Sequence, residues 1–197
     1  MTKKLLPPTT MLMPLPAVLV SCCDADRNPN MITIAWCGIV CSEPPMLSIA
    51  IRENRHSFEI IKNSGEFVVN ITGADIINEV DFCGINSGRD LDKFDATGLT
   101  PIPAAKIAPP LIKECPINLE CQVRRILELG SHYLFIGEIV ATQIDEDILD
   151  ENGKPIISKI DPIVYFPNAR EYWTGLTIRQ GNYGYTRGLK SVGSASK

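Results

Sequence analysis

Three residues at the end of a strand-like segment, Arg52, His56 and Ser57, have the types and spacing of an anion-binding site. The last two open an apolar run that Gly65 closes, which predicts a short helix over 55–63. A helix N-terminus carries free N–H groups and the positive end of a dipole, so it favours an anion. A guanidinium beside it can grip a phosphate with paired donors. The pattern therefore predicts a phosphate site.

Two alternating segments just upstream, 31–40 and 46–52, predict strands with one unusual face. The large apolar residues fall on one side, with Ile32, Ile34 and Trp36 on the first strand and Leu47, Ile49 and Ile51 on the second. The other side is small or weakly polar, with Thr33, Ala35, Ser48 and Ala50. Such a surface lets a flat ligand lie close to the backbone. Together with the anion site, it suggests a phosphorylated planar cofactor.

Each of these residues also has an ordinary structural interpretation. The small residues could be no more than the outer faces of two strands. Arg52 could pair with a surface carboxylate, and Ser57 could serve the first turn of the helix. The structural role and the binding role of Ser57 are compatible, because the same hydroxyl can also bind an anion.

The ordered set of motifs resembles the flavin reductase-like family, and within it flavoredoxin-type and archaeal ferric-reductase-type members. The resemblance covers roughly residues 12–175. It rests on Asn30-x-x-Thr33-x-Ala35-Trp36, Ser42-x-Pro44-Pro45, Arg52-x-x-Arg55-His56-Ser57, Glu66-Phe67-Val68-Val69-Asn70, Ser87-Gly88-Arg89-Asp90-x-Asp92-Lys93-Phe94 and Gly130-Ser131-His132-Tyr133-Leu134-Phe135-Ile136-Gly137-Glu138.

The resemblance implies a split β-barrel that binds FMN, usually as a homodimer. Such proteins pass electrons from NADH, NADPH or another donor through FMN to an acceptor, which could be free flavin, ferric iron or a partner protein. The cofactor-binding residues that it implies are Asn30, Thr33, Ala35, Trp36, Ser48, Ala50, Ile51, Arg52, His56, Ser57, Ser87 and Lys93. We expect the flavin ring against the 31–36 strand and the phosphate near Arg52, His56 and Ser57.

His132 is the candidate catalytic residue. The resemblance places it near the flavin ring, where an imidazole that titrates near physiological pH could assist hydride or proton transfer. A histidine at the start of a strand is also commonly structural. Lys93 lies in a charged run that we expect to form a loop, and the resemblance brings this loop to the cofactor.

Composition narrows the class of protein. A chain of 197 residues with 45% apolar and 21% charged residues is expected to form a single globular domain, here 1–187, with a mobile tail over 188–197. The net charge of −4 argues against nucleic-acid binding. No apolar run approaches the length of about 20 residues that spans a bilayer.

The order of predicted elements favours a mostly β fold with a few short helices. Strands are expected at 17–23, 31–40, 46–52, 66–71, 116–127, 132–143 and 163–166, and helices at 55–63 and 74–84. Few crossover helices separate the strands, which favours antiparallel pairing and a closed barrel. Glu128-Leu129-Gly130-Ser131 predicts a hairpin connection. No Gly-x-Gly-x-x-Gly turn is present, so a nicotinamide nucleotide would not be held in the Rossmann manner.

The N-terminus and the cysteines each allow two interpretations. Lys3-Lys4, an apolar stretch and Leu19-Val20-Ser21-Cys22 resemble a lipoprotein signal, but four prolines interrupt the stretch, and we expect 17–22 to be a barrel strand in a cytoplasmic protein. The seven cysteines show no Cys-x-x-Cys pair and no metal-ligand spacing with the two histidines. We interpret them as small buried apolar residues rather than redox or metal groups, and expect no metal.

Three functions remain open at this point. The first is an FMN-dependent oxidoreductase that uses a nicotinamide nucleotide. The second is a flavoredoxin-like carrier that exchanges electrons with a partner protein and has little nicotinamide activity. The third is a protein that binds flavin without redox turnover. For the dimer, we expect contacts from the barrel edges and from Gly181-Asn182-Tyr183-Gly184-Tyr185.

Overall fold

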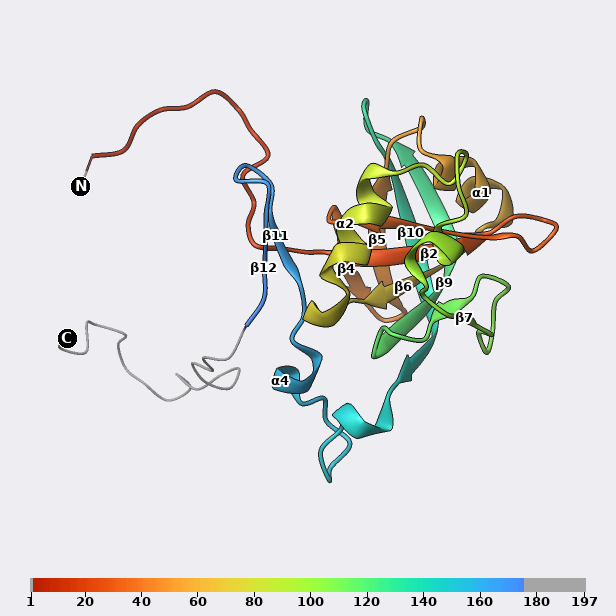
Figure 1. The fold of residues 1–197 in the computed structure, drawn as a ribbon. Helices are drawn as coiled ribbons and strands as arrows, with labels where there is room; N and C mark the ends of the chain where they lie inside the picture. Colours follow the sequence, from red (N-terminus) through yellow and green to blue (C-terminus); the bar gives the residue numbers. More distant parts are fainter. Residues whose placement is uncertain (1, 176–197) are drawn as a thin grey trace.

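A computed structural model describes residues 2–175 and contains a seven-stranded antiparallel sheet that curls into a barrel (Figure 1). Its strands, in sheet order, are β3 (Pro29–Ile34), β2 (Val18–Cys23), β6 (Glu66–Ile71), β9 (Ile117–Glu128), β10 (Tyr133–Ile144), β5 (Pro45–Ile51) and β4 (Cys37–Ser42). Every neighbouring pair is antiparallel. The predicted mostly β fold is confirmed.

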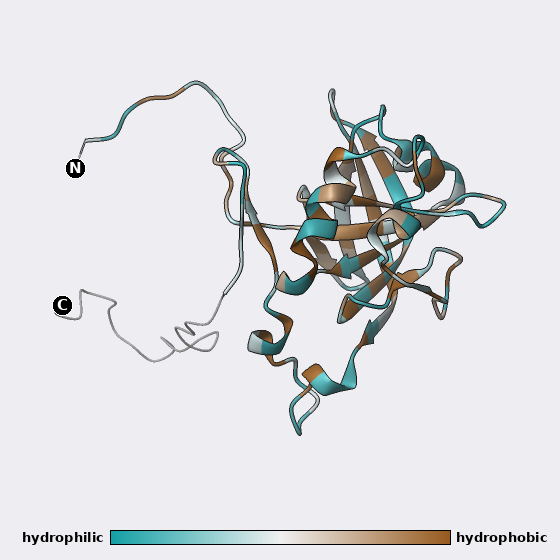
Figure 2. Cartoon of the chain, in the orientation of Figure 1, coloured by the Kyte–Doolittle hydropathy of each residue, from teal (hydrophilic) through white to brown (hydrophobic). Residues whose placement is uncertain are grey.

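The barrel closes around a core of large apolar side chains from alternate strand positions. Its fully buried members include Phe67, Phe135 and Ile49 from the strands and Phe58 from the helix that follows β5. Each strand places every second residue inward, which is why the alternation in the sequence predicts them. Figure 2 shows the same division, with apolar residues along the strands and hydrophilic residues in the outer loops.

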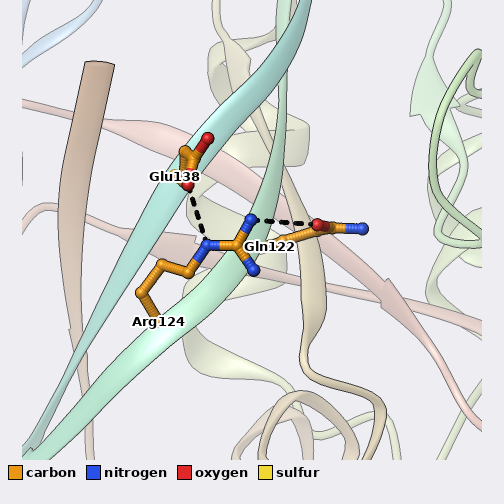
Figure 3. Close-up of polar contacts among 3 residues, drawn as sticks. All are labelled: Gln122, Arg124 and Glu138. Atoms are coloured by element: carbon orange, nitrogen blue, oxygen red, sulfur yellow. Dashed lines mark hydrogen bonds and ion pairs between the residues drawn. The ribbon is translucent and has the colours of Figure 1, made fainter. Parts of the chain in front are cut away.

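The hairpin of β9 and β10 is the longest in the sheet, and it bends where its register shifts. At Gly137 a Cβ atom would lie 2.7 Å from the Phe67 ring, so only glycine lets the strand pass this close to the core. On the outer surface, the Arg124 guanidinium donates to Glu138 at 2.8 Å and to Gln122 at 3.3 Å (Figure 3). This exposed network joins the two strands across the hairpin.

The helices pack on the side of β2 and β3. They are α1 (His56–Ser64), the 3₁₀ turn η1 (Ala74–Ile76), α2 (Ile77–Ile85) and α3 (Lys93–Thr97). A second apolar cluster fills the space between η1, α2, α3 and the sheet, with Leu19 and Met31 from the strands and Val80 and Phe94 from the helices. The buried apolar residues of α1 belong to the barrel core instead. The barrel thus has two cores separated by the β2–β3 pair.

The remaining elements extend the fold at its edges. A small sheet of β1 (Leu15–Pro16), β11 (Val164–Phe166) and β12 (Glu171–Trp173) lies beside the N-terminal segment (Figure 1). Two more strands, β7 (Pro101–Ile102) and β8 (Leu111–Ile112), form a separate pair. The turn η2 (Glu146–Ile148) and the helix α4 (Ile157–Ile160) lie between β10 and β11.

A buried carboxylate fixes the loop between β7 and β8. Glu120 accepts hydrogen bonds from the N–H groups of Ala105 and Lys106, at 2.9 and 2.7 Å, and from the Gln143 amide at 2.7 Å. Burial raises the pKa of Glu120, but these hydrogen bonds outweigh it, and the net pKa lies below the ordinary value.

Two predictions about the first strands are wrong. Residues 31–40 form two strands rather than one, because the chain turns at Ala35, where the Cys37 N–H donates to the Ala35 carbonyl at 3.0 Å. Trp36 therefore does not share the buried face of Ile32 and Ile34, and 40% of its surface is exposed. The predicted dimer segment 181–185, the domain end at 187 and the tail lie outside the described residues.

Within residues 2–175, no helix combines the length and the apolar character that a membrane crossing requires.

Candidate functional site

A hollow of about 330 Å³ lies between the start of α1 and the loop before α3. Its lining includes Arg55, His56 and Ser57 from one side and Ser87 and Lys93 from the other. No side chain caps the first turn of α1, whose N-cap is Arg55. The Phe58 N–H donates to the Arg55 carbonyl at 3.0 Å, which leaves the His56 and Ser57 N–H groups to meet solvent or a ligand. Cationic side chains and a helix start therefore face the same small space.

Ser57 and Asn30 form the floor of this region. Ser57 is 1% exposed, and its hydroxyl accepts a hydrogen bond from the Asn30 amide at 2.8 Å. The same amide lies 3.9 Å from the Cys22 sulfur. Asn30 lines an adjoining hollow of about 350 Å³, which shares His56 and Lys93 with the first. The sequence-predicted Asn30, His56, Ser57 and Lys93 thus come together.

The predicted charged loop is present up to Asp92, but Lys93 itself is the first residue of a helix rather than part of the loop. It begins α3, which Asp92 caps by accepting from the Phe94 and Asp95 N–H groups. The side chain is 4% exposed, and its ammonium donates to the Met31 carbonyl at 2.9 Å and the Cys83 carbonyl at 2.8 Å. Burial lowers the pKa of Lys93. An ammonium has three donors, so one remains for a ligand in the hollow.

The loop from Ser87 to Arg89 closes the hollow at its outer side. A Cβ at Gly88 would overlap the Asn30 amide and lie 3.0 Å from the His56 ring, so only glycine lets the loop approach this closely. The Arg89 guanidinium donates to the Asn54 carbonyl at 3.0 Å, which ties the loop to the chain before α1. The Ser87 hydroxyl accepts from the Arg89 N–H.

Trp36 marks the second part of the site. Its carbonyl accepts from the Ala50 N–H at 2.9 Å, which joins the corner between β3 and β4 to β5. Around this corner lies an apolar hollow of about 520 Å³, lined among others by Trp36, Ser48, Ala50 and Leu134. The face of β5 that carries the small residues Ser48 and Ala50 therefore borders this hollow, beside the exposed Trp36 indole.

His132, at the start of β10, lies against this corner. Its ring stacks with that of Trp36, with centroids 6.2 Å apart and planes 13° from parallel. Its Nδ1 is 2.9 Å from the Ser131 hydroxyl. Burial lowers the pKa of His132, and the positive charge of Arg52 lowers it further, so the imidazole is neutral at pH 7.

The predicted small face of β3 is partly covered by α2. The Thr33 hydroxyl donates to the Val80 carbonyl, and the position of a Cβ on Gly84 would be 3.4 Å from Thr33. Thr33 and Ala35 also line a fourth hollow of about 360 Å³, together with Trp36 and Arg55.

Two other predicted residues differ in their exposure. The Ile51 side chain is 2% exposed and belongs to the barrel core, so only its main chain is available to a ligand. Arg52 is exposed and lines none of the four hollows described here, although its charge acts on His132. Arg55, which lines two hollows, was not among the predicted ligands. The sequence signal for Arg55 was the spacing Arg52-x-x-Arg55, which places a second arginine at the helix start.

The cysteines are reduced and mostly buried. Burial raises the pKa values of Cys22, Cys37 and Cys121 to about 12 each, which makes their thiols poor nucleophiles at neutral pH. Among the described residues, no group of three or more His, Cys, Asp or Glu side chains could hold a metal ion.

Comparison with known proteins identifies the family of this chain. The model of the flavin reductase-like domain matches residues 10–174. The chain belongs to the flavin reductase-like family. The resemblance drawn from the motifs is thereby confirmed, and the barrel is the split barrel of that family.

The relatives include proteins of archaea and bacteria. The flavoredoxin of Desulfovibrio vulgaris (Miyazaki F) superimposes with a TM-score of 0.88 and 33% identity, over 94% of this chain and 100% of that one. A flavoredoxin from Methanosarcina acetivorans gives 0.86 and 30%, over 95% and 100%. An uncharacterized protein of Archaeoglobus fulgidus is 36% identical over 67% of this chain and 73% of its own.

The position of Lys93 makes its contribution to stability measurable. Lys93→Met keeps the length of the side chain but leaves the Met31 and Cys83 carbonyls without their ammonium donor. We expect the free energy of unfolding to fall by about 1–3 kcal/mol in urea denaturation. The matched control is Lys106→Met, whose side chain is exposed. Equal stability of the two variants would contradict the anchoring role of Lys93.

Proposed function

We propose that the protein binds FMN and passes electrons from a nicotinamide nucleotide through it to an acceptor, which could be free flavin, ferric iron or a partner protein. The observation that carries this proposal is the anion hollow at the start of α1, which continues through Arg55 to the exposed Trp36 corner. The likeness to two flavoredoxins and the family itself support a flavin-linked redox function.

The residues of the site fit FMN at both of its ends. The uncapped start of α1, the donors of Ser57 and Lys93 and the close approach at Gly88 suit a phosphate monoester. The small side chains of Ser48 and Ala50 beside Trp36 suit a flat ring. The chain has no dinucleotide fingerprint, which favours FMN over FAD.

When bound, FMN supplies the two-electron chemistry, and the protein supplies binding, orientation and electrostatics. In this proposal Arg55, Ser57 and Lys93 hold the phosphate, with Arg52, Asn30, His56 and Ser87 around it. Thr33, Ala35 and the main chain at Ile51 border the ring. The neutral His132 offers Nε2 to the ring edge, because its Nδ1 contacts Ser131, and Trp36 fixes its plane.

A second function is an electron carrier with little nicotinamide activity. The likeness to two flavoredoxins favours this function, because the superposition covers the whole length of both. The two functions share the flavin site and differ in the donor. Steady-state oxidation of NADH and NADPH separates them, since a carrier shows little of either.

We further propose a homodimer in the cytoplasm. The hollow beside Trp36 is bordered by exposed apolar residues from separate segments, namely Met11, Leu12, Ile39, Val40 and Leu129. An apolar patch of this kind on a soluble protein commonly marks an interface. The thiols of all seven cysteines are free, as expected in a reducing compartment.

The first test concerns the phosphate. Arg55→Ala removes a charge-assisted contact of about 1.5–3 kcal/mol and should weaken FMN binding roughly 10- to 150-fold. Riboflavin, which lacks the phosphate, should lose much less. Calorimetric titration of both ligands measures this, with Arg125→Ala as an exposed control. The sequence-based assignment predicts the same selectivity for Arg52→Ala. Equal losses for FMN and riboflavin would rule out a phosphate contact.

The second test concerns His132. His132→Ala should slow reduction of FMN by NADH or NADPH while FMN affinity changes little, because an interaction made mainly in the transition state affects the rate more than binding. Anaerobic stopped-flow reduction of FMN-loaded protein gives the rate. Lys106→Met, at an exposed residue outside the site, is the control. An unchanged rate in His132→Ala eliminates the catalytic role.

The third test concerns the dimer. Light scattering should give the mass of two chains for the wild type. Ile39→Asp places a charge in the proposed interface and should shift the protein toward monomer. Ile157→Asp, at an exposed apolar residue on α4, should not. A monomeric wild type, or the same mass for both variants, would contradict the proposed interface.

A further inference from the structure

Asn30 lies between the two hollows at the start of α1 and lines only one of them. Its side chain borders the hollow of about 350 Å³ but not the hollow of about 330 Å³, which Ser57 and Lys93 line. The residue is 6% exposed, so it has little freedom to turn toward a ligand. An effect of Asn30 on a phosphate in the second of these hollows must therefore pass through a neighbour.

The two ends of the Asn30 carboxamide have different surroundings. Its nitrogen donates to the Ser57 hydroxyl oxygen at 2.8 Å and lies 3.9 Å from the Cys22 sulfur. Its oxygen faces the loop before α3, where a Cβ at Gly88 would overlap it. Because an amide nitrogen can only donate, Ser57 is the acceptor in this contact.

The contact leaves the proton of the Ser57 hydroxyl for another partner. Within residues 2–175, this hydroxyl donates to no carbonyl or carboxylate oxygen, and its other contact is the Cys22 thiol. Burial raises the pKa of Cys22 to about 12, so the thiol is neutral at pH 7 and is a weak acceptor. An anionic phosphate oxygen in the adjacent hollow is a much stronger acceptor.

The rest of the inner wall also offers donors. The His56 and Ser57 N–H groups are free at the start of α1, and the Lys93 ammonium has a third N–H beyond the two on carbonyls. Arg55 adds a guanidinium, and among the described residues that line this hollow the exposed Asp90 is the one with a carboxylate. A Ser57 hydroxyl turned the other way would present a lone pair to the anion.

We propose that Asn30 is a positioning residue that sets the selectivity for FMN over riboflavin, because it holds the Ser57 hydroxyl with its proton toward the phosphate. This inference rests on the proposed function and gives Asn30 a role other than direct contact with the cofactor. Riboflavin ends in a neutral hydroxyl that can donate as well as accept, so the orientation of Ser57 matters less to it.

Calorimetric titration of the full chain with FMN and with riboflavin tests this role. Asn30→Leu keeps the shape but removes the donor, and should weaken FMN about 2- to 12-fold and riboflavin much less. In a Ser57→Ala background, the same substitution should change FMN affinity by less than about 2-fold.

A second variant reverses the contact. In Asn30→Asp the carboxylate accepts from Ser57 and its charge repels the phosphate, so FMN should weaken about 10- to 150-fold. The matched control is Asn118→Leu, at a buried asparagine of β9 that is also 6% exposed. It should keep the wild-type ratio of FMN affinity to riboflavin affinity.

This ratio separates an effect on the site from an effect on the fold. A partly unfolded variant binds both ligands more weakly by the same factor, so lost stability leaves the ratio unchanged. A wild-type ratio in both Asn30 variants would overturn the proposal, as would an equal effect of Asn30→Leu with and without the Ser57 hydroxyl. Failure of the wild type to bind either flavin would overturn the proposed function and this role with it. Binding of FMN by the wild type without the expected effects would overturn the positioning role alone.

Discussion

The buried ammonium of Lys93 is the interaction on which the candidate site depends. It donates to a carbonyl of β3 and to a carbonyl of α2, so it holds a helix against the outer face of the barrel. A buried charge is costly unless it is hydrogen-bonded, and two carbonyls meet that requirement here. The helix α3 begins at Lys93, so the same hydrogen bonds also position the loop before α3 next to the start of α1. The anion hollow is the space that these joined elements leave.

The barrel supplies the rigid part of the arrangement. Phe58 of α1 packs inside it, against Tyr133 and Phe135 of β10, with ring centroids 4.8 and 5.6 Å away. The helix that presents its N-terminus to the hollow is thus fixed to the strand that begins beside His132. The two ends of the proposed flavin site are therefore positioned by one core, and a change in that core would move both.

Much of the fold could be predicted from the chain because its strands carry a local signal. Alternation in β5 indicates which residues face the core, and the apolar runs of β2 and β6 indicate strands that are buried on both faces. Where the local signal misleads, a local event is responsible. The alternation through Trp36 continues past the end of β3, but the turn at Ala35 ends the strand, and the indole is exposed. The charged run before Phe94 is a loop up to Asp92, but Asp92 caps a helix that begins at Lys93.

The sequence by itself determined the family, the barrel strands and the helix start that faces an anion, because these follow from residue types at short spacing. It also placed His132 and Lys93 among the candidate residues. Only the tertiary structure decided that Lys93 is buried between two carbonyls and that His132 stacks on Trp36. Each of these joins residues far apart in the chain. Such contacts depend on how strands and helices pack around two cores, and no local pattern encodes that packing.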